Sequence, residues 1–352
     1  MVSDQEQIVF LRDVQRLLTE GQFTATYKFA LILALADIAV EQGNDGSGEM
    51  EIETTAIAEK FIQYYWRHTK PFTSGHGTPF ILRQNLGNTP AVITELIEAT
   101  TGGVTSLADL QKESRKWKGI VGRVRRTVCN QPLRYLPTMA SGRHSFLYED
   151  NAQIQAGQVV ERVTLKPGVM FCLRRFYDLV ADLVRGAWVR YARRNNADNL
   201  GAPTDLDEFL FGSERAPLTA FVSVLRTVQN SRCFYCDREM KLEQAHVDHF
   251  IPWSLYPVDL GHNFVLAHAA CNSAKADHLA AVGHFSNWMK RNRAAETFLK
   301  TEFDRLRLLH DREASIHVAK WAYGKGGEVT RTWVAKARFE LLPSDWLDRV
   351  AA

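Results

Sequence analysis

The sequence has little cysteine, no long apolar run and almost no net charge. Its 352 residues include five cysteines, an odd number unevenly spread, which excludes a disulfide framework. The longest apolar run, Phe29 to Val40, has twelve residues and contains Asp37, whereas a membrane-spanning helix needs ~20. The N-terminus has no basic stretch leading into an apolar one, so it does not resemble a secretory signal. We therefore expect a soluble cytoplasmic protein with no membrane partner.

The distribution of charge is more informative than its sum. The 43 basic and 40 acidic side chains give a net charge of +3, which by itself indicates no nucleic-acid partner. Residues 111–143, however, hold nine Lys or Arg against the single Glu113, and a second basic segment runs from Arg174 to Arg194. Each segment is either a solvated helix face or a surface that binds phosphates. The candidate DNA contacts are Arg123, Arg125, Arg126, Arg174 and Arg175.

The pattern of apolar residues divides the chain into three parts. Apolar positions recur every three or four residues within 8–18, 27–40, 57–66 and 92–97, which predicts helices there. The polar segment 195–203 contains Gly and Pro and marks a domain boundary. We expect an α-helical domain over 1–200, a compact module over 201–290 with its core at 228–279, and a C-terminal helix with a small cap over 291–352. The predicted fold class is α+β, mainly α.

Two pairs of residues in the second part have the spacing of metal ligands. Cys233 and Cys236 lie three residues apart, so that a tight turn aims two sulfurs at one tetrahedral ion. His268 and Cys271 repeat this spacing and add a nitrogen and a third sulfur. Together the four predict a closed Cys3His zinc site. His246 is the alternative fourth ligand, and two buried cysteines with an incidental histidine are the alternative to a metal site.

Three further elements lie between and after these pairs. They are Asp248-His249-Phe250-Ile251-Pro252, Asn263-Phe264-Val265-Leu266 and Cys271-Asn272-Ser273-Ala274-Lys275. In their order and in the gaps between them, the chain resembles the HNH endonuclease family over about residues 228–279, a seventh of its length. The resemblance implies a small ββα-metal module in which two antiparallel strands and a helix hold a catalytic cation. A structural zinc ion stabilises such a module, which buries little apolar surface.

The resemblance also implies a role for each site residue. His249 is the general base, and Asp248 and Asn272 are ligands of a catalytic Mg²⁺ or Mn²⁺. Asn263 is a structural asparagine that keeps His249 aimed at its water. Lys275 either contacts a substrate phosphate or is an ordinary solvated lysine. These roles agree with the chemistry, because a neutral imidazole is a base near pH 7 and hard cations prefer oxygen ligands. The chain departs from this branch of the family at His268, where cysteine is more common.

The implied activity is metal-dependent hydrolysis of DNA phosphodiester bonds, by nicking or by double-strand cleavage. Proteins of such architecture often resemble restriction or anti-phage effectors. One alternative is a non-catalytic zinc-containing protein that binds DNA. Another, a zinc-dependent nucleobase deaminase, is disfavoured because no proline precedes Cys233 and the nearest match to His-x-Glu is His246-Val247-Asp248. The helical domain either binds DNA or senses a regulatory protein or small-molecule trigger.

Overall fold

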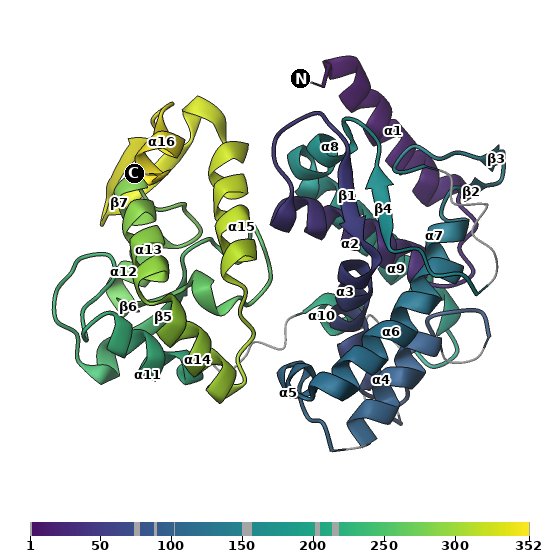
Figure 1. Cartoon of the computed structure of the whole chain (residues 1–352), viewed down its shortest axis with the longest axis horizontal. Coiled ribbons are helices and arrows are strands. Elements are labelled where there is room, and N and C mark those ends of the chain that lie inside the picture. The colour runs from purple at the N-terminus through teal and green to yellow at the C-terminus, as the bar shows by residue number, and fades with distance from the viewer. Residues whose placement is uncertain are drawn as a thin grey trace. The chain divides into compact units, whose positions relative to one another are not determined.

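The chain forms two compact units, Met1–Gly212 and Ser213–Ala352, in the computed structural model (Figure 1). The structure describes residues 2–73, 78–87, 90–101, 103–149, 157–200, 205–212 and 218–351. In these ranges helices dominate both units and the strands form only two-stranded sheets, which confirms the mainly helical fold class. The division at residues 200 and 290 stays a prediction, and residues 201–204 lie outside the described part. Among the described helices, none has the length and apolar character that a membrane crossing requires.

The first unit is built around helix α2, Tyr27–Gln42, which contains the longest apolar run of the sequence. Almost every residue of α2 is buried, as expected for a helix that is apolar on all its faces. Helices α3, α8 and α9 pack against it. The helices of this unit are α1 Asp4–Glu20, α2, α3 Thr54–Trp66, α4 Ala91–Thr101, α5 Leu107–Lys112, α6 Ser114–Asn130, α7 Pro132–Tyr135, α8 Val169–Arg175, α9 Tyr177–Asn195 and α10 Leu206–Phe211, with a 3-10 turn at Arg67–Thr69.

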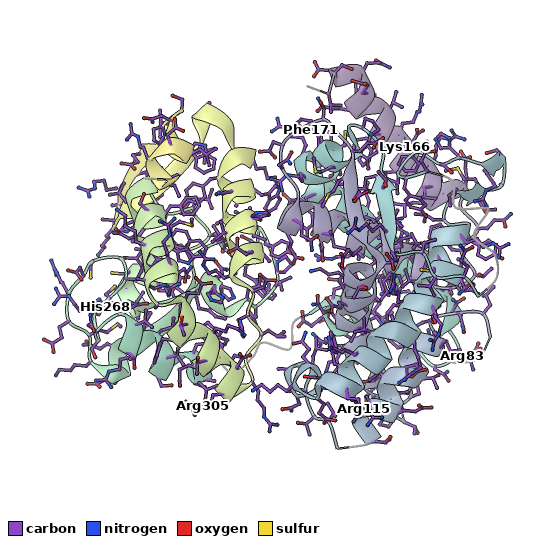
Figure 2. The ribbon with its side chains drawn as sticks, in the orientation of Figure 1. Arg83, Arg115, Lys166, Phe171, His268 and Arg305 are labelled. Carbon is purple, nitrogen blue, oxygen red and sulfur yellow. The ribbon has the colours of Figure 1, made fainter. Side chains whose placement is uncertain are left out.

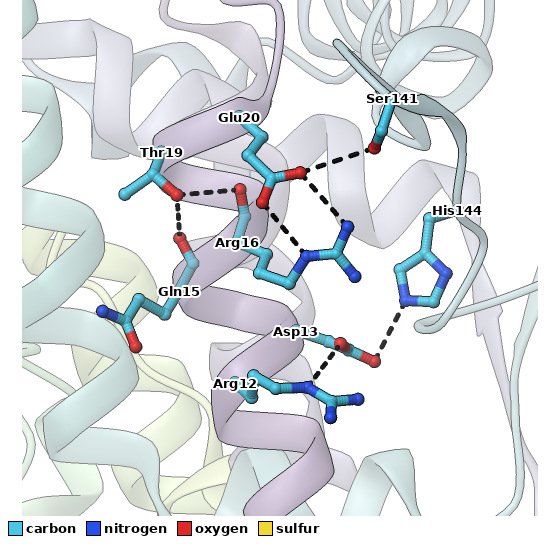
Figure 3. A network of polar contacts seen from close by, with 8 residues as sticks. All are labelled: Arg12, Asp13, Gln15, Arg16, Thr19, Glu20, Ser141 and His144. Carbon is cyan, nitrogen blue, oxygen red and sulfur yellow. Dashed lines mark hydrogen bonds and ion pairs between the residues drawn. The ribbon is translucent and has the colours of Figure 1, made fainter.

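Two small antiparallel sheets complete the first unit. Strand β1, Met50–Glu53, pairs with β4, Arg162–Leu165, and β2, Thr138–Met139, pairs with β3, Gly142–Arg143. The segment that follows β3 is tied to α1 by polar contacts (Figure 3). There His144 Nε2 lies 3.0 Å from Asp13 Oδ2.

Polar side chains inside the first unit are satisfied by specific partners. Asp37 on α2 accepts hydrogen bonds from the hydroxyls of Tyr64 (2.6 Å) and Tyr177 (2.7 Å). One turn later, Glu41 accepts a bond of 2.6 Å from Lys60. A buried carboxylate is costly without such partners. The two acidic residues of α2, Asp37 and Glu41, are therefore the points at which this helix is bonded to its neighbours.

The second unit consists of short strands between helices. Its helices are α11 Thr219–Val228, α12 Ala269–Lys275, α13 Val282–Ala294, α14 Glu296–Leu306, α15 Arg312–Lys325 and α16 Trp346–Ala351, with 3-10 turns at Leu242–Gln244, Gly261–Asn263 and Gly327–Val329. Its strands are β5 Ala245–His249, β6 Phe264–His268, β7 Arg331–Ala335 and β8 Arg338–Leu341. Phe250 stacks on Trp288 at the centre of the core, with ring centroids 5.1 Å apart, and Phe285 lies beside both rings.

Strands β5 and β6 and helix α12 position the residues singled out in the sequence. The strands are antiparallel, with Asp248 opposite Val265 and His249 opposite Phe264. Helix α12 begins directly after β6 and contacts both strands. The three elements therefore bring the two ends of segment 245–275 together.

Candidate functional site

The side chains of Cys233, Cys236, His268 and Cys271 converge in the second unit. Their four ligand atoms all lie within 4.8 Å of one another, and the Nδ1 atom of His268 is 3.4 Å from the Cys236 sulfur. His268 (labelled in Figure 2) ends β6, and Cys271 lies in the first turn of α12. We call these four residues the cysteine group. The group can bind a zinc ion, because three sulfurs and one nitrogen suit the tetrahedral coordination of zinc.

The geometry selects His268 over His246 as the fourth member of this group. His246 is exposed on β5, where it pairs with Ala267, and it does not belong to the group of converging ligand atoms. His268 stands one residue further along β6 and turns toward the cysteines. The spacing of the sequence left both histidines open as the fourth ligand. The register of β5 and β6 places His268, and not His246, beside the three cysteines.

Three thiols this close together favour a bound cation. Burial, reinforced by the neighbouring Cys233 and Cys236, raises the pKa of the Cys271 thiol to about 12. A coordinated dication reverses this effect, because a coordinating thiol loses its proton outright. The donor set and its electrostatics therefore both fit a metal site.

Asp248 lies at the end of β5 among hydrogen-bond donors. It is buried, and its Oδ2 atom accepts a hydrogen bond of 2.5 Å from the hydroxyl of Tyr235. Lys275 Nζ is 3.3 Å from the same oxygen. The other carboxylate oxygen, Oδ1, has no hydrogen-bond partner in the described part of the chain and is not among its buried unpaired atoms. One oxygen of Asp248 is thus held in place while the other is open to a ligand.

Tyr235 is a site residue that the sequence analysis missed. It lies between Cys233 and Cys236, where only the cysteines attracted attention. Burial raises the pKa of its phenol well above the usual range, so the hydroxyl keeps its proton and donates to Asp248. No spacing rule identifies this contact, because it depends on how the cysteine turn packs on β5.

Lys275 occupies a different environment from the one expected. Its side chain is fully buried, and its Nζ donates to the carbonyl of His249 at 2.9 Å. Burial lowers the pKa of Lys275, while the neighbouring Asp248 acts in the opposite direction. The expectation of a substrate phosphate contact is corrected here, because a fully buried ammonium does not reach a phosphate. Lys275 is instead an internal counter-ion for Asp248.

Asn263 closes the loop between the strands. Its side-chain oxygen accepts a bond of 2.8 Å from the Ile251 backbone N–H, and its amide donates to the Ile251 carbonyl at 3.0 Å. The Phe250 N–H also donates to the carbonyl of Asn263, at 2.8 Å. These three bonds fix the chain directly after His249.

Asn272 lies in the first turns of α12, the helix that packs on β5. Its side chain is half-buried and makes no hydrogen bond within the described residues. It follows Cys271 directly on α12 and precedes Lys275 by three residues. A free amide oxygen and the open Oδ1 of Asp248 fit the oxygen ligands that a hard cation prefers.

His249 contacts a carboxylate that the sequence analysis also missed. Its Nε2 atom lies 2.8 Å from Asp259 Oδ1, and both side chains are largely buried. The imidazole makes edge-to-face contacts with two aromatic rings, with centroid distances of 5.4 Å to Trp253 and 4.7 Å to Phe264. These three neighbours fix the plane of the ring.

Two of the three candidate arginines of α6 have partners within their own unit, and the third is exposed. Arg125 donates to Thr54 Oγ1 at 2.7 Å and to the Val160 carbonyl at 3.2 Å, so it links α6 to the rest of its unit. Arg123 pairs with Glu95. Arg126 is exposed and has no ion-pair partner within the described chain.

Arg174 does not face solvent. Its guanidinium is bonded to Asp45 and to the carbonyls of Ala39, Val40 and Gly43 at the end of α2. Only 5% of its side chain is exposed, and we remove it from the DNA-contact candidates. Arg175, the next residue, is exposed and remains a candidate.

Two family models match this chain, one for each unit. The model described as "HNH endonuclease" matches residues 233–278, which include the cysteine group, Asp248, His249 and Asn272. The model described as "Domain of unknown function (DUF8808)" matches residues 9–209. No curated protein and no solved structure matches the chain. The chain carries an HNH endonuclease domain and, with more than half of its length matched, belongs to the family described as "Domain of unknown function (DUF8808)".

Proposed function

We propose that the protein is a metal-dependent endonuclease that hydrolyses phosphodiester bonds of DNA. One observation carries the proposal: Asp248 and His249 end strand β5 against α12, which bears Asn272, while the cysteine group closes a separate metal site beside them. A structural metal and a catalytic metal need different ligands, sulfur and nitrogen for the first and oxygen for the second. The module offers both sets.

His249 is the general base of the proposed reaction. It accepts a proton from a water molecule, whose oxygen attacks the phosphorus while the bond to the leaving 3′ oxygen breaks. Asp248 and Asn272 would hold a Mg²⁺ or Mn²⁺ ion, which when bound supplies positive charge to the phosphate and the leaving oxygen. Tyr235 and Lys275 orient Asp248 through its Oδ2 atom. Asn263 holds the backbone that follows His249.

The test compares two histidines of the same strand. Purified protein is incubated with supercoiled plasmid in Mg²⁺, in Mn²⁺ or in chelator, where relaxed circles report nicking and linear DNA reports double-strand cleavage. His249→Ala is expected to lower the cleavage rate by ~10²–10⁴-fold and to leave DNA binding intact. His246→Ala is the matched control, because it removes an exposed imidazole three residues earlier on β5. Equal activity of the two variants would contradict the assignment of the base.

The alternative, a zinc-containing protein that binds DNA without cleaving it, predicts binding without cleavage in all divalent cations. The proposed role in restriction or anti-phage defence depends on family resemblance alone. Phage DNA is therefore included as a second substrate, together with unmodified plasmid. Cleavage of one and not the other would define the biological target of the nuclease.

The helical unit is proposed to contact the DNA backbone through α6. Arg115 (labelled in Figure 2), Lys118 and Arg126 are exposed on this helix. They have no ion-pair partner among the residues that the structure describes. Phosphate contacts of this kind hold a nuclease on its substrate without specifying sequence. The alternative, that the unit senses a regulatory protein or small molecule, predicts DNA binding that is independent of these side chains.

A further inference from the structure

The contact between His249 and Asp259 determines which nitrogen of the imidazole carries the proton. An ionised carboxylate only accepts hydrogen bonds, so the Nε2 atom at 2.8 Å from Asp259 Oδ1 is the protonated one. In the neutral ring the lone pair then lies on Nδ1. The Nδ1 atom has no hydrogen-bond partner among the described residues, and it is absent from the buried unpaired atoms of the described chain. The basic nitrogen of His249 is therefore the one that is open to water.

Among the residues that the structure describes, the side chain of Asp259 has no polar partner other than His249. Its side chain is largely buried, and its second oxygen, Oδ2, is buried without a partner among the described residues. Burying a carboxylate in this way is costly. The bond to His249 is the compensation that the described structure shows.

The loop around Asp259 is fixed at both ends. Asn263 bonds twice to Ile251 on the far side of the loop, and the Gly261 N–H donates to the Leu309 carbonyl at 2.9 Å. A Cβ atom at Gly261 would lie 2.8 Å from the Phe303 ring, so the chain passes close to α14 at this point. The carboxylate is thus presented to His249 by a closed loop.

We infer that Asp259 is a positioning residue for the proposed nuclease reaction. It selects the tautomer of His249 that has Nδ1 free, and it stabilises the imidazolium that forms when Nδ1 takes the proton from water. Asp259 touches neither DNA nor the catalytic ion in this scheme and acts only through His249. The inference rests on the proposed function for its catalytic consequence, but the tautomer itself is a property of the folded protein.

The first experiment reads the tautomer without any reaction. The full-length protein is labelled with ¹⁵N-histidine, and the imidazole nitrogens of His249 are assigned by the signals missing from His249→Ala. At about pH 8, where an ordinary imidazole is neutral, we expect a protonated Nε2 and an unprotonated Nδ1. Asp259→Leu, which keeps a similar volume without an acceptor, is expected to give a mixture of tautomers. A protonated Nδ1 in the unmodified protein would overturn the inference, whether or not the protein cleaves DNA.

The second experiment is a double-mutant cycle on single-turnover cleavage of plasmid. Asp259→Leu is expected to lower the single-turnover rate constant at saturation about a hundredfold with the half-saturating concentration unchanged, a part of the ~10²–10⁴-fold that a general base contributes. In the His249→Ala background the same substitution is expected to have no further effect, because residues that act as a unit are not additive. Asp259→Asn retains an oxygen for the Nε2–H and is expected to recover part of the rate.

An equal loss on both backgrounds would show a merely structural role for Asp259 and would overturn the inference. Thermal unfolding of each variant separates such a loss from incomplete folding. An unmodified protein without cleavage activity would instead contradict the proposed function. In that case the labelled-histidine spectrum still decides the Asp259 contact.

Discussion

The Tyr235 hydroxyl donates a 2.5 Å hydrogen bond to Asp248 from within the turn that carries two of the four cysteine-group ligands. The turn that bears Cys233 and Cys236 is therefore connected to Asp248 through one side chain. A change in the cysteine turn would move the donor that orients the carboxylate. The cysteine group and the Asp248 carboxylate are in this way parts of one structural unit.

Tyr235→Phe should weaken Mg²⁺ binding at Asp248 more than its effect on stability alone would predict. Loss of a hydrogen bond to a charged group costs ~1.5–3 kcal/mol, and it also frees Asp248 to rotate. Tyr323→Phe is the matched control, since it removes another buried hydroxyl of the same unit that donates to the Ala280 carbonyl at 2.5 Å. We expect similar losses of stability by thermal unfolding, and weaker Mg²⁺ binding by calorimetry only for Tyr235→Phe. Equal Mg²⁺ affinity would remove Tyr235 from the site.

Lys275→Met should make the second unit dependent on divalent cations. Removing one partner of a buried ion pair costs ~3–5 kcal/mol because the other charge stays buried. A cation bound at Asp248 would replace the missing ammonium, so added Mg²⁺ should raise the Tm of Lys275→Met more than that of the unmodified protein. The control is Lys290→Met, because Lys290 is exposed on α13. An identical Mg²⁺ response of the two variants would contradict the counter-ion role.

Removing metal from the cysteine group should unfold one unit and spare the other. The ligands come from a turn, a strand end and a helix start, so their release uncouples three elements. With chelator or in Cys236→Ser, amide hydrogen exchange in β5, β6 and α12 should accelerate at least a hundredfold, equivalent to ~3 kcal/mol. Exchange in α2 should stay unchanged. Cys129→Ser, a change in the other unit, is the control, and uniform acceleration in both units would argue against a local metal site.

His68 should make the stability of the first unit depend on pH. It is fully buried, with its Nε2 atom 3.1 Å from the Leu210 carbonyl, and burial lowers its pKa to about 4. The unfolded chain binds a proton near pH 6.5 and the folded chain only near pH 4, so stability is complete above pH 6.5 and falls as pH decreases toward 4. The expected loss approaches ~3 kcal/mol.

His68→Gln offers an amide donor for the Leu210 carbonyl but does not titrate. Its unfolding free energy, measured in urea, should vary less between pH 6.5 and pH 4 than that of the unmodified protein. The difference between the two curves isolates the contribution of the imidazole from that of the carboxylates. Parallel curves would show that the buried ring does not control this pH range.

Arg126→Glu should weaken DNA binding and reduce its dependence on salt. Each phosphate contact contributes ~0.9 to the slope of log K against log salt concentration, so the loss of one contact lowers the slope by about that amount. Arg12→Glu is the control, because Arg12 is an exposed arginine on α1 in the same unit. Binding to a short duplex is measured over a range of salt concentrations. A slope unchanged by Arg126→Glu would exclude this helix face as the interface.

The sequence alone was sufficient for the chemistry that depends on local spacing. The two cysteines of the turn, and the pair His268 and Cys271, are each three residues apart, and such spacing already brings two ligands to one ion. The helical periodicity of the first two hundred residues likewise reflects contacts between neighbouring turns. Asp248 and His249 were recognisable because they are adjacent within a motif.

The partners of those residues were decided only by the tertiary structure. Asp259 meets His249 because a closed loop returns the chain, Tyr235 meets Asp248 because the cysteine turn packs on β5, and Arg174 is buried because it bonds the carbonyls at the end of α2. None of these contacts has a fixed separation along the chain. They depend on where each loop closes and on which side chains are buried. A buried polar group loses its contacts with water and bonds to the group that the fold places beside it. The local motif identified the candidate residues, and the fold determined which groups contact and orient them.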